Sequence, residues 1–237
     1  MREPSRSAEQ ETELLFGHTF RIDSTKKSWV YGQALSPLGG IDGYAGWMKR
    51  KYLIEDYAPR SHYISAMKAP VFSKTDIKSR ITRLLPLGSH INAARIGDKF
   101  CELASGGFVH RRHLTPLGDY PERDFVKIAQ AHIGLPYIWG GISTDGLDCS
   151  GLVQASLRAI GRDCLRDAGQ QEKSLGQALS SGRAMRRGDL VFWAGHVGIM
   201  SDSENLLHAN AFHMKVALEP FETACARIGL PRSIRCL

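Results

Sequence analysis

Hydrophobic and polar residues alternate in short runs over the first half of the chain. Such runs occupy residues 20–22, 29–31, 81–85 and 91–93, with Gly, Pro, Asn and Asp between them. A period of two residues is typical of strands whose faces differ in burial, and the punctuation is typical of turns. This half of the chain is therefore predicted to form small β-barrels.

An internal repeat divides this half into two. The sequence GWMKRKYL at residues 46–53 matches GFVHRRHL at residues 107–114 without a gap. Each copy contains glycine, an aromatic residue, an aliphatic residue, three mostly basic residues, a ring and a leucine. We predict two tandem barrels, at residues 1–60 and 61–117, each of about sixty residues, a size at which a single core is marginal.

The pattern changes to helical spacing after residue 117. Pro121 suits a first helical turn, and apolar residues from Phe125 to Ile133 recur at helical spacing before the sequence GLP ends the helix. A second helix is predicted to begin after Asp148 as N-cap and to stop at Gly161. Strands are predicted at 188–193, 196–200 and 206–209, so residues 118–237 form an α+β domain.

A cysteine stands where a glycine-rich loop meets the second predicted helix. Cys149 lies in the sequence LDCSGLV, and His196 and His208 stand in two strands that a hairpin could bring together. A helix N-terminus lowers the pKa of a thiol and so favours the nucleophilic thiolate. One imidazole can take the thiol proton while a second polar group orients that imidazole. These residues predict a cysteine hydrolase that needs no cofactor.

Charge, apolar runs and cysteine content indicate the partners and the compartment of this protein. The formal net charge is +7, but the basic residues are scattered, so a nucleic-acid partner is not predicted. No run approaches the roughly 18 apolar residues of a membrane span, and residues 1–12 lack the apolar core of a secretory signal. The five cysteines form no CxxC pair and suit a reducing compartment. A cytoplasmic protein with no membrane partner is expected.

Five segments together resemble the NlpC/P60 family of papain-like cell-wall peptidases. In family order they are PYIWGG at 136–141, DCSGLV at 148–153, RGDLVF at 187–192, HVGIM at 196–200 and LHA at 207–209. The resemblance implies a helical piece carrying the cysteine, packed on an antiparallel sheet carrying both histidines. The two preceding repeats resemble bacterial SH3 domains, so the implied fold is a papain-like α+β catalytic domain after two SH3-like barrels.

The resemblance implies roles for the catalytic residues. Cys149 would be the nucleophile, His196 the base and His208 the residue that orients His196. Tyr137 would supply a hydrogen bond to the oxyanion or to the substrate.

The whole arrangement is similar to γ-D-glutamyl-L-diamino-acid endopeptidases of the dipeptidyl-peptidase VI type. These enzymes recycle murein peptides, cut between γ-D-glutamate and the diamino acid, and require a free N-terminal L-alanine. The resemblance implies that Asp148 and Ser150 line the site for the L-Ala-γ-D-Glu unit, and that Arg166 and Asp167 contact substrate.

The first barrel would close one end of the cleft in this group. Tyr44 matches the tyrosine that faces the cleft, and Glu13 is the candidate for a second acidic partner of the substrate amine. The identity of the diamino acid, meso-diaminopimelate or lysine, stays open, as does the oligomeric state.

Several of these residues have alternative interpretations. Asp148 suits an N-cap, which needs no ligand, so capping and substrate contact both stay open. Cys149, His196 and His208 could bind zinc, although no further ligand has convincing spacing. Trp139 is predicted to be a core residue rather than a platform for substrate.

Two other functions stay open. One is an exported hydrolase of intact peptidoglycan, and the other is a non-catalytic wall-binding module that uses its paired SH3-like barrels. The complete set of one cysteine and two histidines argues against the binding module, and the expected lack of a signal argues against both.

Overall fold

The computed structural model describes residues 1–39, 43–55, 58–179 and 183–237. These residues form two compact units, Met1–Pro121 and Glu122–Leu237, and each unit is described by itself. Among the described residues, no helix has the length and the apolar character to cross a membrane.

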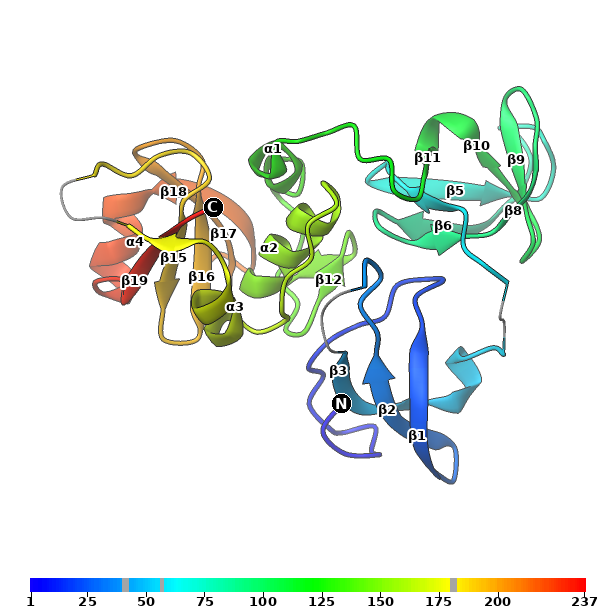
Figure 1. Cartoon of the computed structure of the whole chain (residues 1–237), viewed down its shortest axis with the longest axis horizontal. Coiled ribbons are helices and arrows are strands. Elements are labelled where there is room, and N and C mark those ends of the chain that lie inside the picture. Colours follow the sequence, from blue (N-terminus) through cyan, green and yellow to red (C-terminus); the bar gives the residue numbers. More distant parts are fainter. Residues whose placement is uncertain (40–42, 56–57, 180–182) are drawn as a thin grey trace. The chain divides into compact units, whose positions relative to one another are not determined.

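The first unit begins with an antiparallel meander. Strands β1 (Phe20–Lys26), β2 (Trp29–Ala34) and β3 (Tyr44–Lys49) pair in that order (Figure 1). Trp29 and Val30 are buried on β2, whereas nearly all of β1 is exposed. The meander therefore has a small core, as expected for a module of this size.

The rest of the first unit is a second group of short strands. Strands β6, β5, β10, β9 and β8 form one sheet in that order, and β11, β4 and β7 form another. Their bounds are β4 His62–Ile64, β5 Lys68–Phe72, β6 Ile81–Pro86, β7 His90–Ile91, β8 Ala93–Ile96, β9 Phe100–Leu103, β10 Phe108–His110 and β11 Leu114–Pro116. Both sheets share a core that includes Ile64, Val71, Ile91 and Val109.

The internal repeat has the same local structure in both copies. The 3-10 helix Arg50–Tyr52 follows β3 in the first copy, and the 3-10 helix Arg111–His113 follows β10 in the second. The two groups are not cleanly divided, because Phe16 precedes β1 yet packs against the core of the second group. The Phe16 carbonyl also accepts a hydrogen bond from the His90 amide.

The second unit is built on an antiparallel sheet with the order β14, β19, β15, β16, β17, β18. Its strands are β14 Gln177–Ala178, β15 Leu190–Trp193, β16 His196–Met200, β17 Asn205–Asn210, β18 Lys215–Pro220 and β19 Ser233–Cys236. A two-stranded ribbon of β12 (Ile142–Ser143) and β13 (Gly146–Leu147) lies before the central helix.

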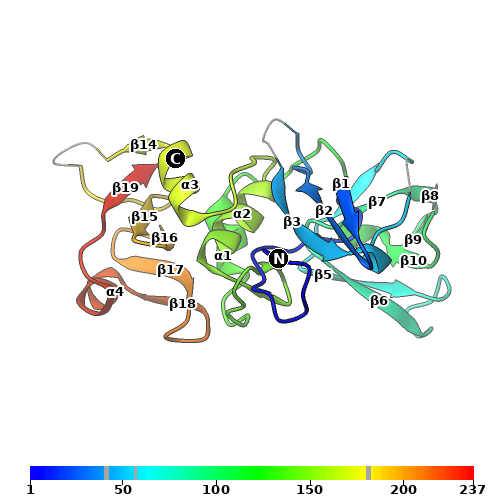
Figure 2. The ribbon, with the colours of Figure 1, turned by 90° about the horizontal axis from the view of Figure 1, so that it is seen from below.

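Helices cover both faces of this sheet. Helices α1 (Phe125–Gln130), α2 (Cys149–Arg158) and α3 (Ala168–Ser174) contribute to the larger core on one face, with Val197, Ile199 and Leu207 of the sheet. Helix α4 (Phe221–Ile228) covers the opposite face and packs against Trp193 and Leu206. Figure 2 shows α1 and α2 on one side of the sheet and α4 on the other. The α+β class predicted for this part of the chain agrees with the structure.

The helix boundaries show which local signals are decisive. Helix α2 begins after Asp148, as predicted, because the Asp148 carboxylate accepts a hydrogen bond of 2.7 Å from the Gly151 amide. The start predicted for α1 is wrong: Asp124 caps that helix through the amides of Val126 and Lys127, and Pro121 lies outside it. A capping carboxylate satisfies free amides of the first turn, which proline cannot do.

Candidate active site

The thiol of Cys149 lies at the first position of α2, close to the residue that precedes strand β16. Cys149 is buried, and its Sγ lies 4.0 Å from the Gly195 carbonyl oxygen, one residue before β16. The position follows from a close fit between loop and helix. A Cβ at Gly151 would stand 2.0 Å from the Gly141 carbonyl oxygen, so only glycine allows the loop to pack here.

The two predicted histidines are in direct contact. Strands β16 and β17 are antiparallel neighbours, with Ile199 opposite Leu207, and this pairing carries both imidazoles on the same face. His196 Nε2 lies 2.9 Å from His208 Nδ1, so one of these two nitrogens donates to the other. His208 is fully buried, and this hydrogen bond fixes the orientation of the more accessible His196 ring.

Burial keeps both reacting groups of the site uncharged at rest. Desolvation raises the pKa of the Cys149 thiol to about 11, while hydrogen bonds from the backbone at Val197 and Ser150 oppose the shift. Desolvation, followed by the neighbouring His208 and Arg227, lowers the pKa of His196 to about 4. A neutral imidazole is a proton acceptor at physiological pH, so His196 can take the thiol proton when the sulfur attacks.

A buried ion pair fixes the loop that precedes Cys149. Arg166 donates to both carboxylate oxygens of Asp148, at 3.0 and 2.6 Å, and to the Ser150 hydroxyl at 2.9 Å. Asp148 also accepts from the Gly140 amide at 2.9 Å and from the Ser150 hydroxyl at 3.2 Å. With its capping bond to the Gly151 amide, the Asp148 carboxylate has a full set of donors from the protein.

Comparison with known proteins shows which family has these residues. The NlpC/P60 family profile matches residues 134–227, which include the thiol and both imidazoles. Gamma-D-glutamyl-L-lysine dipeptidyl-peptidase of Bacillus subtilis is 30% identical over 220 residues, which cover 84% of this chain and 72% of that protein. The chain belongs to the NlpC/P60 family. The prediction of an NlpC/P60 cysteine peptidase is thereby confirmed.

Other relatives agree with the family and the fold. Dipeptidyl-peptidase 6 of Lysinibacillus sphaericus is 27% identical over 231 residues, which cover 88% of this chain and 83% of that protein. A crystal structure of an NlpC/P60 family protein from Bacillus cereus superposes with a TM-score of 0.81 at 22% identity, over 95% of this chain and 81% of that chain. That likeness shows the shared fold.

The N-terminal part has a family of its own. The profile of the bacterial dipeptidyl-peptidase SH3 domain matches residues 1–53, which confirms one SH3-like domain. A second SH3-like barrel is not confirmed and stays a prediction, as do the boundaries at residues 60 and 117.

Of two further predicted site residues, Tyr137 lies beside the Cys149 thiol and Asp167 stands at the start of another helix. Tyr137 is half-buried and packs against the larger core. Burial, followed by Cys149 and Asp148, raises the pKa of Tyr137 to about 12, so its hydroxyl stays a donor. Asp167 is the N-cap of α3 and forms a capping box with Gln170.

The remaining predictions have different outcomes. Tyr44 begins β3 and Glu13 precedes β1 in the first unit, and their part in a substrate site stays a prediction. The core position predicted for Trp139 is wrong, because this side chain is 57% exposed. It follows Ile138 in a loop whose turn directs the ring outward, while Ile142 fills the interior nearby.

Two residues next to His208 were not predicted from the sequence. His208 Nε2 lies 2.6 Å from Glu219 Oε1, and Glu219 in turn accepts hydrogen bonds from the Arg227 guanidinium, one of them at 2.9 Å. Glu219 is the penultimate residue of strand β18, and Arg227 is in the last turn of α4. No local signal marks these residues, because their significance depends on which strand pairs with β17.

The zinc interpretation does not agree with the geometry. In the parts of the chain that the structure describes, no three His, Cys, Asp or Glu side chains are grouped to hold a metal ion. His196 and His208 use facing nitrogens for their mutual hydrogen bond, so those nitrogens do not converge on a common point.

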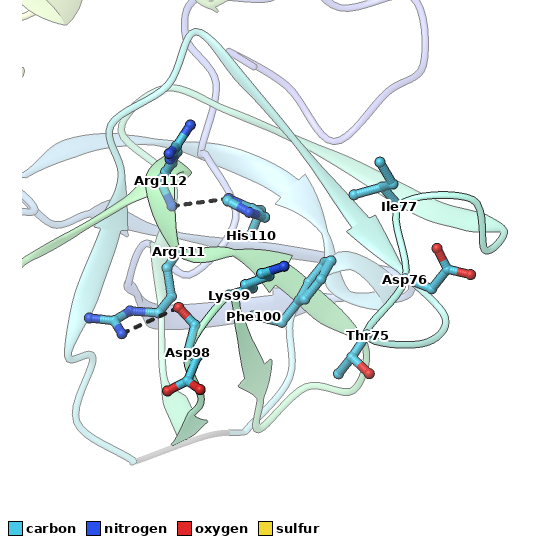
Figure 3. Close-up of a pocket in the computed structure, with 9 residues that line it drawn as sticks. All are labelled: Thr75, Asp76, Ile77, Asp98, Lys99, Phe100, His110, Arg111 and Arg112. Carbon is cyan, nitrogen blue, oxygen red and sulfur yellow. Dashed lines mark hydrogen bonds between the residues drawn. The ribbon is translucent and has the colours of Figure 1, made fainter.

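An open pocket in the first unit has a different chemistry. It is lined by Thr75, Asp76, Ile77, Asp98, Lys99, Phe100, His110, Arg111 and Arg112. Figure 3 shows the loop of Thr75, Asp76 and Ile77 across from Arg111 and Arg112. The Arg111 guanidinium donates to the Gly97 and Asp98 carbonyl oxygens and thereby supports the fold. The pocket has no thiol, and its acids and bases are mixed, so we assign it no role in the peptidase site.

Proposed function

We propose that this peptidase hydrolyses the γ-D-glutamyl–diamino-acid bond of small murein peptides that carry a free N-terminal L-alanine. Two observations together support this most. The buried Cys149 thiol lies next to Gly195, the residue before His196, which is hydrogen-bonded to His208, and the chain is similar to dipeptidyl-peptidases across most of its length. The relatives from Bacillus subtilis and Bacillus cereus are named gamma-D-glutamyl-L-lysine dipeptidyl-peptidases.

In the proposed mechanism the thiol attacks the γ-carbonyl carbon. His196 takes the thiol proton as the C–S bond forms, and His208 holds the imidazole in place. The proton then passes from His196 to the leaving amine of the diamino acid as the C–N bond breaks, which leaves a thioester on Cys149. Water attacks that thioester with His196 again as the base, releases L-Ala-D-Glu and restores the thiol.

The negative oxygen of the tetrahedral intermediate needs donors that are already in place. Tyr137 is suited to this, because its raised pKa of about 12 keeps the hydroxyl proton available. In this role Tyr137 would stabilise charge that is absent from the bound peptide, so its loss should reduce kcat more than KM.

Recognition of the free amine needs a carboxylate, and that of Asp148 is already occupied by protein donors. In this proposal Asp148, Ser150 and Arg166 hold the loop beside the substrate in place. The acidic partner of the ammonium group is assigned to Asp167 or Glu13. A blocked N-terminus would leave that carboxylate unpaired, at a cost of about 1–3 kcal/mol.

Mass spectrometry of the products tests the proposal. L-Ala-γ-D-Glu-L-Lys and its meso-diaminopimelate counterpart should each be assayed with a free and with an acetylated N-terminus, beside intact sacculi. We expect cleavage of a free peptide at the γ-glutamyl bond and at least tenfold slower cleavage of the acetylated peptide. Equal rates for both forms would refute recognition of the amine, and release from sacculi alone would favour the exported wall hydrolase.

The nucleophile has a matched control within the chain. Cys149→Ala should abolish turnover, whereas Cys225→Ala, at a half-buried cysteine on α4, should leave it unchanged. Turnover near the parent level in Cys149→Ala would refute the assignment.

We also propose that the enzyme works inside the cell. All five cysteines are free thiols, which suits a reducing compartment. Fractionation of the native host should place the protein with cytoplasmic markers, and recovery from the wall or the medium would contradict this.

A further inference from the structure

Glu219 lies beyond His208 as the third member of a hydrogen-bonded chain that starts at His196. Glu219 is directly opposite Leu206 in the pairing of β17 with β18, and Ala217 is directly opposite His208. Diagonal neighbours on one sheet face are within reach of long side chains. Glu219 is the diagonal neighbour of His208 in this register, and its Oε1 lies 2.6 Å from His208 Nε2.

The position of Glu219 is fixed from several sides. The Arg227 guanidinium binds both carboxylate oxygens, and the guanidinium carbon lies 4.3 Å from the centre of the Phe212 ring. His213 Nε2 is 3.4 Å from Glu219 Oε1. The titratable and charged groups facing Glu219 are thus His208 from β17, His213 from the turn before β18, and Arg227 from α4.

An ionised carboxylate can only accept hydrogen bonds, and this determines where the protons of both rings lie. The proton of His208 must be on Nε2, where it is donated to Glu219. Neutral His208 then has a lone pair on Nδ1, which accepts the Nε2–H of His196. Neutral His196 consequently carries its own lone pair on Nδ1, the nitrogen left free to take the thiol proton.

We propose that Glu219, held by Arg227, is a positioning residue that sets the tautomers of His208 and His196 for the peptidase reaction. The proposal rests on the proposed function, and it adds a carboxylate and a guanidinium to the Cys–His–His set. The ion pair with Arg227 also lowers the pKa of Glu219 to about 2, so the carboxylate stays ionised over the working range.

The substitution Glu219→Leu removes the acceptor and keeps a side chain of similar size. His208 Nε2–H would then be buried without a partner beside the positively charged Arg227 guanidinium, which favours a lone pair on that nitrogen. His208 then carries its proton on Nδ1 and presents a donor to His196, which forces the proton of His196 onto the nitrogen that should accept from sulfur. Replacing a triad aspartate by its amide in serine proteases lowers kcat about 10⁴-fold through a wrong tautomer. Glu219 is one ring further away, so we expect a smaller loss, about 10- to 100-fold in kcat, with KM within about twofold.

The conservative substitution Glu219→Gln provides a rescue. Oε1 receives hydrogen bonds from both His208 and Arg227, so the amide oxygen is expected at that position, where it keeps the His208 proton on Nε2. We expect Glu219→Gln to recover at least fivefold in kcat over Glu219→Leu. Glu222→Leu, at an exposed acidic residue of α4, is the matched control and should behave as the parent.

Three measurements are made on each full-length variant: kcat and KM on L-Ala-γ-D-Glu-L-Lys, the melting temperature, and the histidine tautomers from ¹⁵N NMR. The proposal requires that His208 carries its proton on Nε2 in the parent and in Glu219→Gln, and on Nδ1 in Glu219→Leu. It is overturned if the His208 tautomer is unchanged in Glu219→Leu, or if kcat of Glu219→Leu stays within twofold of the parent. It is also overturned if kcat falls in Glu219→Leu and Glu219→Gln shows no rescue, because the role of Glu219 is then structural. If the parent cleaves no murein peptide, the proposed function fails, while the NMR result still decides the role of Glu219.

Discussion

Replacing Arg166 by methionine removes the cation from the buried ion pair beside the catalytic thiol. The Arg166 side chain is 4% exposed and that of Asp148 is 10% exposed, so water cannot substitute for the lost partner. Methionine keeps the unbranched apolar stem and most of its packing. The perturbation is therefore mainly the loss of charge and of the hydrogen bonds that Arg166 donates to Asp148 and Ser150.

The size of the effect follows from the bonds that remain. Breaking a buried ion pair by removing one partner costs about 3–5 kcal/mol, because the other charge is left uncompensated. Asp148 would still accept from the amides of Gly140 and Gly151 and from the Ser150 hydroxyl. These donors offset part of the loss, so we expect the free energy of unfolding of the second unit to fall by about 3 kcal/mol.

Two further variants make the measurement specific. Asp148→Asn/Arg166→Met has no uncompensated charge and keeps an N-cap of similar quality, so it should be more stable than Arg166→Met. Lys127→Met breaks the Lys127–Glu122 pair, whose lysine is 69% exposed, and should leave the free energy of unfolding nearly unchanged.

Native-state hydrogen exchange of the β15 and β16 amides measures the stability of the second unit separately from the first. These strands lie at the centre of the sheet, and β15 is buried throughout. A loss below about 1 kcal/mol in Arg166→Met, or a double variant less stable than the single variant, would refute the reasoning.

Three other predictions concern titration and metal dependence. Histidine in the unfolded chain binds a proton below about pH 6.5, whereas folded His196 does so only near pH 4. Between these pH values the unfolded state binds more protons than the folded state. The free energy of unfolding therefore falls as the pH falls. His196 should lower the free energy of unfolding by about 2 kcal/mol between pH 8 and pH 5. Chemical denaturation of His196→Gln at the two pH values should lack this decrease. An identical pH dependence in both proteins would contradict the burial of the ring. Alkylation of Cys149, followed by peptide mapping, should keep rising between pH 7 and pH 9 because burial raises its thiol pKa to about 11, and a plateau below pH 7 would indicate a thiolate already formed at rest. EDTA should leave peptide cleavage unchanged while iodoacetamide abolishes it, and the reverse pattern would favour a metal site.

Much of the catalytic segment could be predicted from the sequence because its signals are local. The capping carboxylate of Asp148 and the left-handed glycine at Gly161 determine where α2 begins and where the chain leaves it, and thereby place Cys149 in the first turn. The apolar run at residues 190–193, within the predicted strand 188–193, likewise specifies β15, and the alternation from His196 onward specifies β16. The hairpin that joins His196 to His208 follows from adjacent strands and a short turn.

Only the tertiary structure decided which residues surround this set. Hydropathy would place Leu218 inside and Glu219 outside, yet Leu218 is 45% exposed and Glu219 is 8% exposed. The reason is that α4 covers one face of β18 with an arginine, so a buried carboxylate on that face is paired with Arg227 and hydrogen-bonded to His208. Packing of Phe16 against a core built from residues far along the chain is likewise a tertiary contact. Spacing along a chain determines helices, strands and caps, whereas contacts between segments far apart in sequence depend on sheet register and on which helix covers which face.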